Sequence, residues 1–223
     1  MQDLTIVFDL DGTLVETAPD LIHATNHALS LCGLEPVGAQ EIRPFISFGA
    51  RAMIRKGLEA HGHHVADDEF EALFSSFLAY YADNIAVGSH AFPGLQECLS
   101  RVSRAGARLA VCTNKQEALS RKLLDALDLS KSFGAIAGRD TFPVCKPHPD
   151  HLRGAVKLAG GDPQRAVMVG DSDVDIATAK AAGIPIVAVT FGYTDVPVHD
   201  LSPDAIIDHY RDLEAAIERV LRR

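Results

Sequence analysis

The sequence predicts an α/β fold, with a Rossmann-like parallel β-sheet as its core and a separate helical domain inserted into it. Three observations predict this fold. Residues 5–8 are a short apolar run without alternation, which is the pattern of a strand buried on both faces of a parallel sheet. Residues 16–88 show helical periodicity and no strand pattern. From residue 95 onward, helical and strand patterns alternate, as is typical of right-handed βαβ crossovers.

The inserted segment has the spacing of amphipathic helices. Thr17, Pro19 and Asp20 are typical of a helix start, because a hydroxyl cap, a proline in the first turn and an acidic side chain all suit that end of a helix. Gly33 is typical of the helix end. Further helices are predicted at residues 41–45, 49–58 and 67–84.

The second half of the chain alternates between helix and strand. Helices are predicted at residues 95–104, 117–127, 150–159 and 176–182, and from residue 212 onward. Strands are predicted at residues 109–112, 135–137, 166–169, 186–189 and 205–207. Together with the first strand, these should form one parallel sheet. We therefore expect a core domain of residues 1–15 and 89–223, and a helical domain of residues 16–88.

The composition limits the classes of function. The chain has 223 residues, of which 47% are hydrophobic, and this is enough for a substantial core with an insertion. Its 21 basic and 30 acidic residues give a formal net charge of −9, which disfavours nucleic acid as a partner. No apolar run reaches the roughly 18 residues of a membrane span, and the N-terminus lacks a signal-peptide pattern. We expect a cytoplasmic protein without membrane or nucleic-acid partners, as a monomer or a homodimer.

Asp9 directly follows the first strand, at the sheet edge where open α/β folds carry their ligand sites. Asp11 lies two residues further along near-extended chain, so both carboxylates should point to the same side. Two carboxylates this close require either a retained proton or a metal ion between them. A metal-neutralised Asp9 is a nucleophile, and Asp11 can deliver and retrieve a proton. Gly12 allows a tight turn beside a ligand, and Thr13 offers a hydroxyl to an anion.

Three later clusters also suit a phosphate ester. Thr113 and Asn114 lie at a strand end that opens a helix, where a hydroxyl, an amide and free N–H groups bind phosphate oxygens. Asn114 is also suited to capping that helix. Lys146 can place a point charge against a phosphoryl group. Asp171 follows a predicted strand as Asp9 does, and Mg²⁺ binds a few such oxygens.

The segment DLDGTL at residues 9–14 resembles the first motif of the haloacid dehalogenase-like superfamily of phosphohydrolases. The four motifs of that superfamily are matched in order by Asp9 with Asp11, Thr113, Lys146, and Asp171 with Asp175. The helical insertion between the first two motifs is similar to the C1-type cap of the superfamily. The dehalogenase branch lacks the second Asp of the first motif, which is Asp11 here, so the resemblance implies phosphoryl transfer.

The resemblance also implies a two-step hydrolysis. Asp9 attacks phosphorus while Asp11 protonates the leaving alkoxide, and Asp11 then activates water to hydrolyse the aspartyl-phosphate. The expected ligands of Mg²⁺ are Asp9, Asp171 and the main chain of Asp11. Lys146 and Thr113 are expected to bind the phosphoryl group. We expect Asp175 to support Lys146 or the metal shell rather than to bind the metal directly.

Closer similarity is to the phosphoglycolate phosphatase branch, through the segments TNK at 113–115 and KPHP at 146–149. Gln116 is a departure, because that branch often has proline there. The implied substrate is a small phosphomonoester, most specifically 2-phosphoglycolate, which is hydrolysed to glycolate and phosphate. The core site is already committed to the phosphate group of 2-phosphoglycolate, so the carboxylate of this substrate needs a second positive charge. Arg51, in the first turn of a predicted helix, is expected to supply this charge, the alternative being a solvated side chain on the cap surface.

Other functions are compatible with parts of this pattern. A pyrophosphatase or a β-phosphoglucomutase-like phosphotransferase of the same superfamily would share every core residue, so only the cap could separate them. A receiver-like signalling domain also phosphorylates an Asp on a parallel sheet, but chain length, the cap and Asp11 argue against it. A catalytically inactive scaffold is disfavoured by the complete set of motifs.

Overall fold

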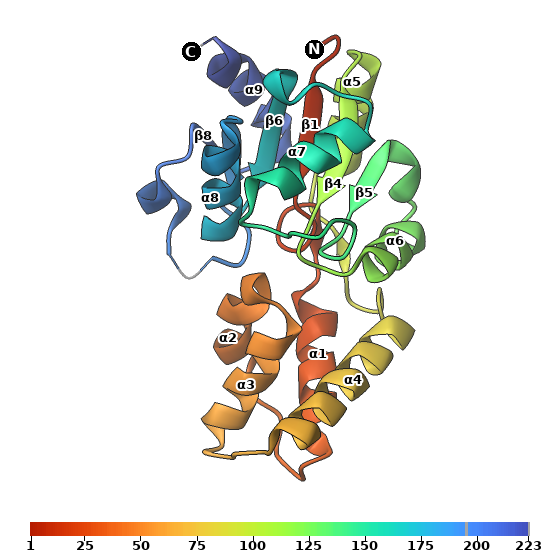
Figure 1. Ribbon diagram of the computed structural model, residues 1–223, viewed down its shortest axis with the longest axis vertical. Helices are drawn as coiled ribbons and strands as arrows, with labels where there is room; N and C mark the ends of the chain where they lie inside the picture. The colour runs from red at the N-terminus through yellow and green to blue at the C-terminus, as the bar shows by residue number, and fades with distance from the viewer. Residues whose placement is uncertain (195, 223) are drawn as a thin grey trace.

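The computed structural model describes residues 1–194 and 196–222. Its centre is a parallel sheet with the strand order β5-β4-β1-β6-β7-β8, as Figure 1 shows in part. The strands are β1 (Thr5–Phe8), β4 (Arg108–Cys112), β5 (Ala135–Ala137), β6 (Ala166–Gly170), β7 (Ile186–Val189) and β8 (Ala205–Ile207). The predicted α/β fold is confirmed, because β1 lies in the middle of the sheet and pairs in parallel with both β4 and β6.

Both faces of the sheet are buried, which explains the apolar run of β1. Ile6 and Phe8 pack into the core on one face, against α5, α6 and α9, and Val7 packs on the other face, against α7 and α8. These helices are α5 (Leu95–Arg104), α6 (Glu117–Ala126), α7 (Pro149–Leu158), α8 (Asp173–Ala182) and α9 (Leu213–Leu221). Short 3₁₀ helices span Ser130–Ser132, Pro163–Arg165, Val198–Leu201 and Tyr210–Asp212.

A second group of helices lies at one end of the sheet, below it in Figure 1. It comprises α1 (Ala18–Ser30), α2 (Ala39–Ile42), a 3₁₀ helix (Arg43–Phe48), α3 (Ala50–Ala60) and α4 (Asp67–Asp83). The two connections to the sheet form a small antiparallel pair, β2 (Val15–Glu16) with β3 (His90–Ala91). The buried Asp20 carboxylate accepts hydrogen bonds from the main-chain N–H groups of Gly88 and Ser89 and fastens the returning chain to α1.

Some predicted helix boundaries were wrong, for local physical reasons. The helix predicted at residues 41–45 is α2 followed by the 3₁₀ helix, since Pro44 has no N–H to continue the α-helical bonding. Helix α8 starts three residues earlier than predicted, because Ser172 and Asp175 form a reciprocal capping box. Thr17 precedes α1 as predicted, but its side chain makes no capping bond.

The start of α1 is satisfied by a distant side chain instead. The hydroxyl of Tyr193 accepts hydrogen bonds from the main-chain N–H groups of Thr17 at 2.6 Å and Ala18 at 3.0 Å. No helix within the described residues is long and apolar enough to cross a membrane.

Candidate active site

The topology brings the sequence motifs together at one edge of the sheet. Asp9 follows β1, Thr113 follows β4 and Asp171 follows β6. Because β1 lies between β4 and β6 and all three run in the same direction, these residues leave the sheet side by side. Lys146 reaches the same place from the loop between β5 and α7.

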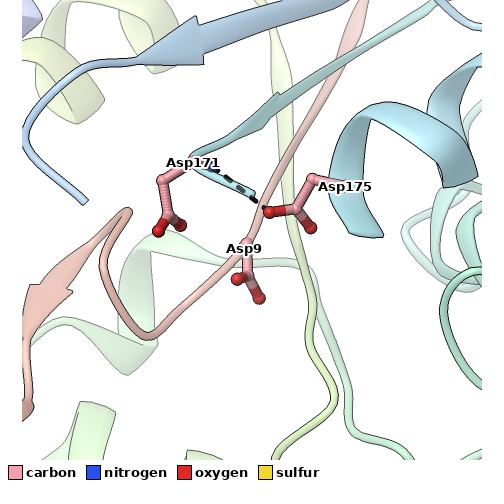
Figure 2. Close-up of side chains that lie close together, drawn as sticks. All are labelled: Asp9, Asp171 and Asp175. Carbon is pink, nitrogen blue, oxygen red and sulfur yellow. Dashed lines mark hydrogen bonds between the residues drawn. The ribbon is translucent and has the colours of Figure 1, made fainter. Parts of the chain in front are cut away.

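Three buried carboxylates form a cluster, which Figure 2 shows. Asp9, Asp171 and Asp175 each offer one oxygen, and these oxygens lie within 4.8 Å of one another. Asp171 accepts a 2.7 Å hydrogen bond from the Thr13 hydroxyl and a 2.8 Å hydrogen bond from the Tyr193 main-chain N–H. Hard carboxylate oxygens in this arrangement suit a small divalent cation such as Mg²⁺.

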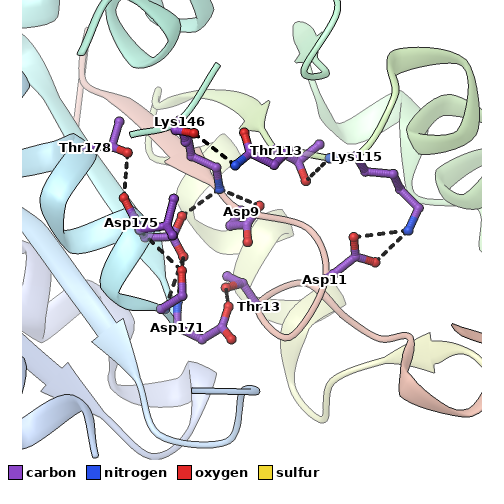
Figure 3. A network of polar contacts seen from close by, with 12 residues as sticks. Asp9, Asp11, Thr13, Thr113, Lys115, Lys146, Asp171, Asp175 and Thr178 are labelled. Atoms are coloured by element: carbon purple, nitrogen blue, oxygen red, sulfur yellow. Dashed lines mark hydrogen bonds and ion pairs between the residues drawn. The ribbon is translucent and has the colours of Figure 1, made fainter. Parts of the chain in front are cut away.

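The Lys146 ammonium lies between two members of this cluster (Figure 3). Its Nζ is 2.8 Å from Asp9 Oδ1 and 2.6 Å from Asp175 Oδ1. Burial alone would lower the pKa of Lys146, but the charges of Asp175 and Asp9 raise it above its usual range. The side chain is therefore charged, and its fixed position beside Asp9 suits it to bind an anionic substrate.

The carboxylates need more positive charge than Lys146 supplies. Burial raises the pKa of Asp9 to about 6 against the opposing effect of Lys146, and the negative charges of Asp175 and Asp11 add to the rise. Burial, with the charges of Asp175 and Asp9, also raises the pKa of Asp171 well above its usual range. A bound cation would lower the pKa values of Asp9 and Asp171 toward their usual range, so this set of carboxylates fits a metal ion.

Asp175 is held too tightly to be a free ligand. Its Oδ1 accepts a hydrogen bond from Lys146, and its Oδ2 accepts hydrogen bonds from the Ser172 hydroxyl at 2.6 Å and the Ser172 main-chain N–H at 3.1 Å. These contacts suit Asp175 to position Lys146 and the turn that carries Asp171.

The Asp11 carboxylate points away from the cluster in Figure 3. It accepts two hydrogen bonds from the Lys115 ammonium, at 2.8 and 3.0 Å. The same Nζ lies 4.5 Å from the ring centroid of Tyr81 on α4, so Lys115 contacts both the loop after β1 and the helical group. Lys115 was not predicted as a site residue. Its position two residues after Thr113 was an available signal, because side chains two apart in extended chain point to the same side.

The other predicted binding residues differ in how directly they face the pocket. Thr113 is buried at the pocket wall, and its hydroxyl accepts a hydrogen bond from Lys115 N. The Asn114 amide donates to the Lys146 carbonyl at 3.0 Å. The interpretation of Asn114 as a helix cap is wrong, because Gln116 is the N-cap of α6.

The turn after β1 requires glycine at position 12. Gly12 has a φ of +83°, and a Cβ there would lie 2.5 Å from an Asp171 oxygen.

Arg51 lies in the first turn of α3, as predicted, and lines the pocket. Its guanidinium is already engaged, since it donates to both oxygens of Glu71 on α4 at 2.5 and 2.7 Å. It also lies 4.0 Å from the ring centroid of Phe74. A free guanidinium at this position would require the Glu71 pair to open.

These residues surround a pocket of about 270 Å³ between the sheet edge and the helical group. Its polar walls come from the sheet side and include Asp9, Asp11, Thr113, Asn114, Lys115 and Lys146. Its apolar walls come from the helical group and include Ile46, Phe48, Met53, Phe74, Phe77 and Tyr81. A small anionic molecule fits such a pocket, with its charged end toward the sheet.

Comparison with known proteins places the chain in a family. The family model described as haloacid dehalogenase-like hydrolase matches residues 6–189. The chain is 49% identical to a phosphoglycolate phosphatase of Mesorhizobium japonicum, over 97% of this chain and 96% of the relative. It is 45% identical to a phosphoglycolate phosphatase of Caulobacter vibrioides, over 95% of this chain and 90% of the relative.

Solved structures agree with the sequence relatives. The crystal structure of a predicted phosphoglycolate phosphatase from Haemophilus somnus superposes with a TM-score of 0.90 at 31% identity, covering 97% of this chain and 99% of that one. The chain therefore belongs to the haloacid dehalogenase-like hydrolase family.

Proposed function

We propose that this protein is a Mg²⁺-dependent phosphatase that hydrolyses 2-phosphoglycolate to glycolate and phosphate. The observation that carries the proposal is the Asp9 carboxylate at the wall of the pocket, 2.8 Å from the buried Lys146 ammonium and beside Asp171. A nucleophile, a fixed cation and a metal-binding carboxylate thus meet where a phosphate would lie. The substrate follows from the similarity to relatives named phosphoglycolate phosphatase.

In this proposal Asp9 is the nucleophile. A carboxylate oxygen of Asp9 attacks phosphorus, the bond from phosphorus to the ester oxygen breaks, and an aspartyl-phosphate forms. Lys146 and Thr113 bind the phosphoryl oxygens, and Asn114 holds the main chain of Lys146 in place. Gly12 lets the main chain turn closely past Asp171.

Asp11 is the proposed acid and base. It gives its proton to the oxygen of the leaving glycolate, and it then takes a proton from the water that attacks the aspartyl-phosphate, which releases phosphate and free Asp9. For this role the carboxylate must leave Lys115, which it contacts through both oxygens. Tyr81 is the cation–π partner of Lys115, so a small rotation of the helical group would also move this ring relative to Lys115.

We assign the metal site to Asp9, Asp171 and the main chain of Asp11. Mg²⁺ bound there would neutralise the carboxylates and withdraw charge from the phosphoryl oxygens. Asp171 is prepared for this role by its bonds from Thr13 and Tyr193, which fix the orientation of its carboxylate. Asp175 contributes by positioning Lys146.

Residues 16–88 are proposed as the cap domain and residues 1–15 and 89–223 as the catalytic core. Apart from Val174, the large apolar side chains that line the pocket come from the segment assigned to the cap, so movement of this segment would admit substrate and then exclude water. A cytoplasmic location and a monomeric or homodimeric state stay predictions.

A panel of phosphate esters tests the proposal. With Mg²⁺, we expect the largest kcat/KM for 2-phosphoglycolate, a smaller value for sugar phosphates and pyrophosphate, and loss of all activity in chelator. A preference for pyrophosphate would support the pyrophosphatase alternative. Interconversion of sugar phosphates without release of phosphate would support the phosphomutase alternative. Full activity in metal-free buffer would contradict the metal assignment.

A further inference from the structure

We propose that Arg139, on the loop after β5, binds the carboxylate of the substrate and thereby selects phosphate esters with a second anionic group. This inference rests on the function proposed above and names the residue that gives it selectivity. The phosphoryl end of the substrate is assigned to Asp9, Lys146 and Thr113, so the other charge of 2-phosphoglycolate needs a cation elsewhere in the pocket.

The described residues that line the pocket include four cations: Arg51, Lys115, Arg139 and Lys146. Three of them are bound to carboxylates of the protein. Lys146 contacts Asp9 and Asp175, Lys115 contacts Asp11, and Arg51 contacts Glu71. Arg139 is exposed, and its guanidinium makes no hydrogen bond or ion pair with the rest of the described chain. It is therefore available to an anionic ligand without breaking an existing pair.

The loop that carries Arg139 is fixed to the core. The Arg139 main-chain N–H donates to the Lys115 carbonyl at 2.9 Å, which connects it to the segment that carries Thr113. Gly138 packs so closely on α6 that a Cβ there would lie 2.2 Å from Glu117 N. The Gly138 carbonyl contacts the buried His151 side chain at 3.0 Å. Because these contacts hold the main chain at Gly138 and Arg139, the Arg139 side chain starts from a fixed position.

The acidic side chains nearest in the sequence have other partners. Asp140 accepts the Glu117 main-chain N–H at 2.8 Å and so satisfies the first turn of α6. Glu117 binds Arg121 at 2.8 Å and also accepts the Thr141 hydroxyl at 2.5 Å. These bonds fasten the loop to α6 and leave the positive charge of Arg139 uncompensated at the pocket.

A free arginine suits this substrate better than a paired one. A guanidinium can bind a carboxylate through two parallel hydrogen bonds. Arg51 would first have to give up two such bonds to Glu71, whereas Arg139 gives up contact with water alone. Arg139 also belongs to the segment assigned to the core, so its distance from Asp9 does not depend on the position of the cap.

The test compares kcat/KM of single variants on two esters with Mg²⁺ present. The esters are 2-phosphoglycolate and phenyl phosphate, which has no carboxylate. We expect Arg139→Ala to lose about tenfold or more on 2-phosphoglycolate and to stay within about twofold of wild type on phenyl phosphate. Arg139→Lys should recover part of the loss, because it keeps the charge without the bidentate geometry. Lys122→Ala, which removes an exposed charge on α6 outside the pocket, should leave both values unchanged.

Arg51→Ala is the matched comparison, since Arg51 lines the same pocket. Its selective loss should be smaller than that of Arg139→Ala. A selective loss in Arg51→Ala with none in Arg139→Ala would overturn the inference. Equal losses of Arg139→Ala on both esters, or no loss on either, would also overturn it.

Binding without turnover gives a second readout. In the Asp9→Asn background, Arg139→Ala should weaken calorimetric binding of 2-phosphoglycolate about tenfold and leave binding of inorganic phosphate unchanged. If wild type hydrolyses 2-phosphoglycolate and Arg139→Ala shows no selective loss, the inference fails while the proposed function stands. If wild type hydrolyses phenyl phosphate but not 2-phosphoglycolate, the proposed substrate fails and the inference fails with it.

Discussion

At the scale of single residues, the three clustered carboxylates differ in their partners and therefore in what they can do. Asp175 has both oxygens bound to neighbouring side chains, and Asp171 has one oxygen on Thr13 and the other on Tyr193 N. Asp9 has Lys146 beside Oδ1 and lines the pocket. These partners fit the proposed roles of Asp9 as the nucleophile, Asp171 as a metal ligand and Asp175 as the residue that positions Lys146.

The raised pKa of Asp9, about 6, predicts a pH dependence of Mg²⁺ binding. Below pH 6 the metal-free carboxyl is mostly protonated and must release its proton before it can bind a cation. The raised pKa of Asp171 acts in the same direction. Calorimetric titration should therefore show that Mg²⁺ affinity increases as the pH rises through about 6.

The control for this measurement is Asp173→Asn, because Asp173 is an exposed carboxylate close to the same turn. This variant should keep the pH dependence of wild type. A Mg²⁺ affinity that stays constant, or falls, between pH 5 and pH 8 would show that protons and the cation do not compete at this cluster.

At the scale of secondary structure elements, the loop after β7 connects three parts of the site. The Tyr193 main-chain N–H donates to Asp171, and its hydroxyl donates to Glu16 at 2.7 Å while accepting the first N–H groups of α1. Arg43, from the 3₁₀ helix, pairs with Glu16 at 2.8 Å and lies 4.9 Å from the Tyr193 ring centroid. This loop therefore couples a proposed metal ligand to the point where the chain enters the helical group.

Tyr193→Phe should lower the free energy of unfolding by about 1–3 kcal/mol, because it leaves the buried Thr17 N–H without its acceptor. Urea denaturation measures this change. The matched control is Tyr80→Phe, since the Tyr80 hydroxyl makes no hydrogen bond with a described residue and its removal should cost less than about 0.5 kcal/mol. If both variants lose the same amount, the hydroxyl of Tyr193 does not stabilise the start of α1.

The elements could largely be predicted from the sequence, because each depends on a local pattern. The strand bounds at residues 5–8, 135–137, 186–189 and 205–207 are confirmed, and Asp9, Thr113 and Asp171 lie at adjacent strand ends. Strands β2 and β3 were missed, since two residues are too short to show a period.

Side-chain pairing could not be predicted in the same way. The partners of Lys115 and Arg51 are 104 and 20 residues away, and such contacts depend on how helices pack after the chain has folded. A sequence pattern reports which residues are present at a strand end or a helix start. It does not report which of them is neutralised by a partner, and this distinction separates Arg51 from Arg139.

At the scale of the whole molecule, the reactive groups and the apolar cover come from different parts of the chain. The sheet side supplies most of the charged residues of the pocket, and the helical group supplies most of the apolar ones. The chain carries a net charge of −9, and, among the described residues, three of the four cations at the pocket are paired with carboxylates of the protein. Attraction of an anionic substrate would therefore depend on Arg139 and on a bound metal ion. A pocket of this size suits a small molecule.

In the proposed mechanism, Asp9 carries the phosphoryl group during turnover. The direct measurement is rapid quenching of the protein with 2-phosphoglycolate and Mg²⁺ at early times, followed by peptide mass spectrometry. We predict one added phosphoryl group on the peptide that contains Asp9, formed before steady state and absent from Asp9→Asn, which should keep its fold and less than about one percent of the activity. Turnover without a covalent phosphoryl group, or with that group on another residue, would show that Asp9 is not the nucleophile.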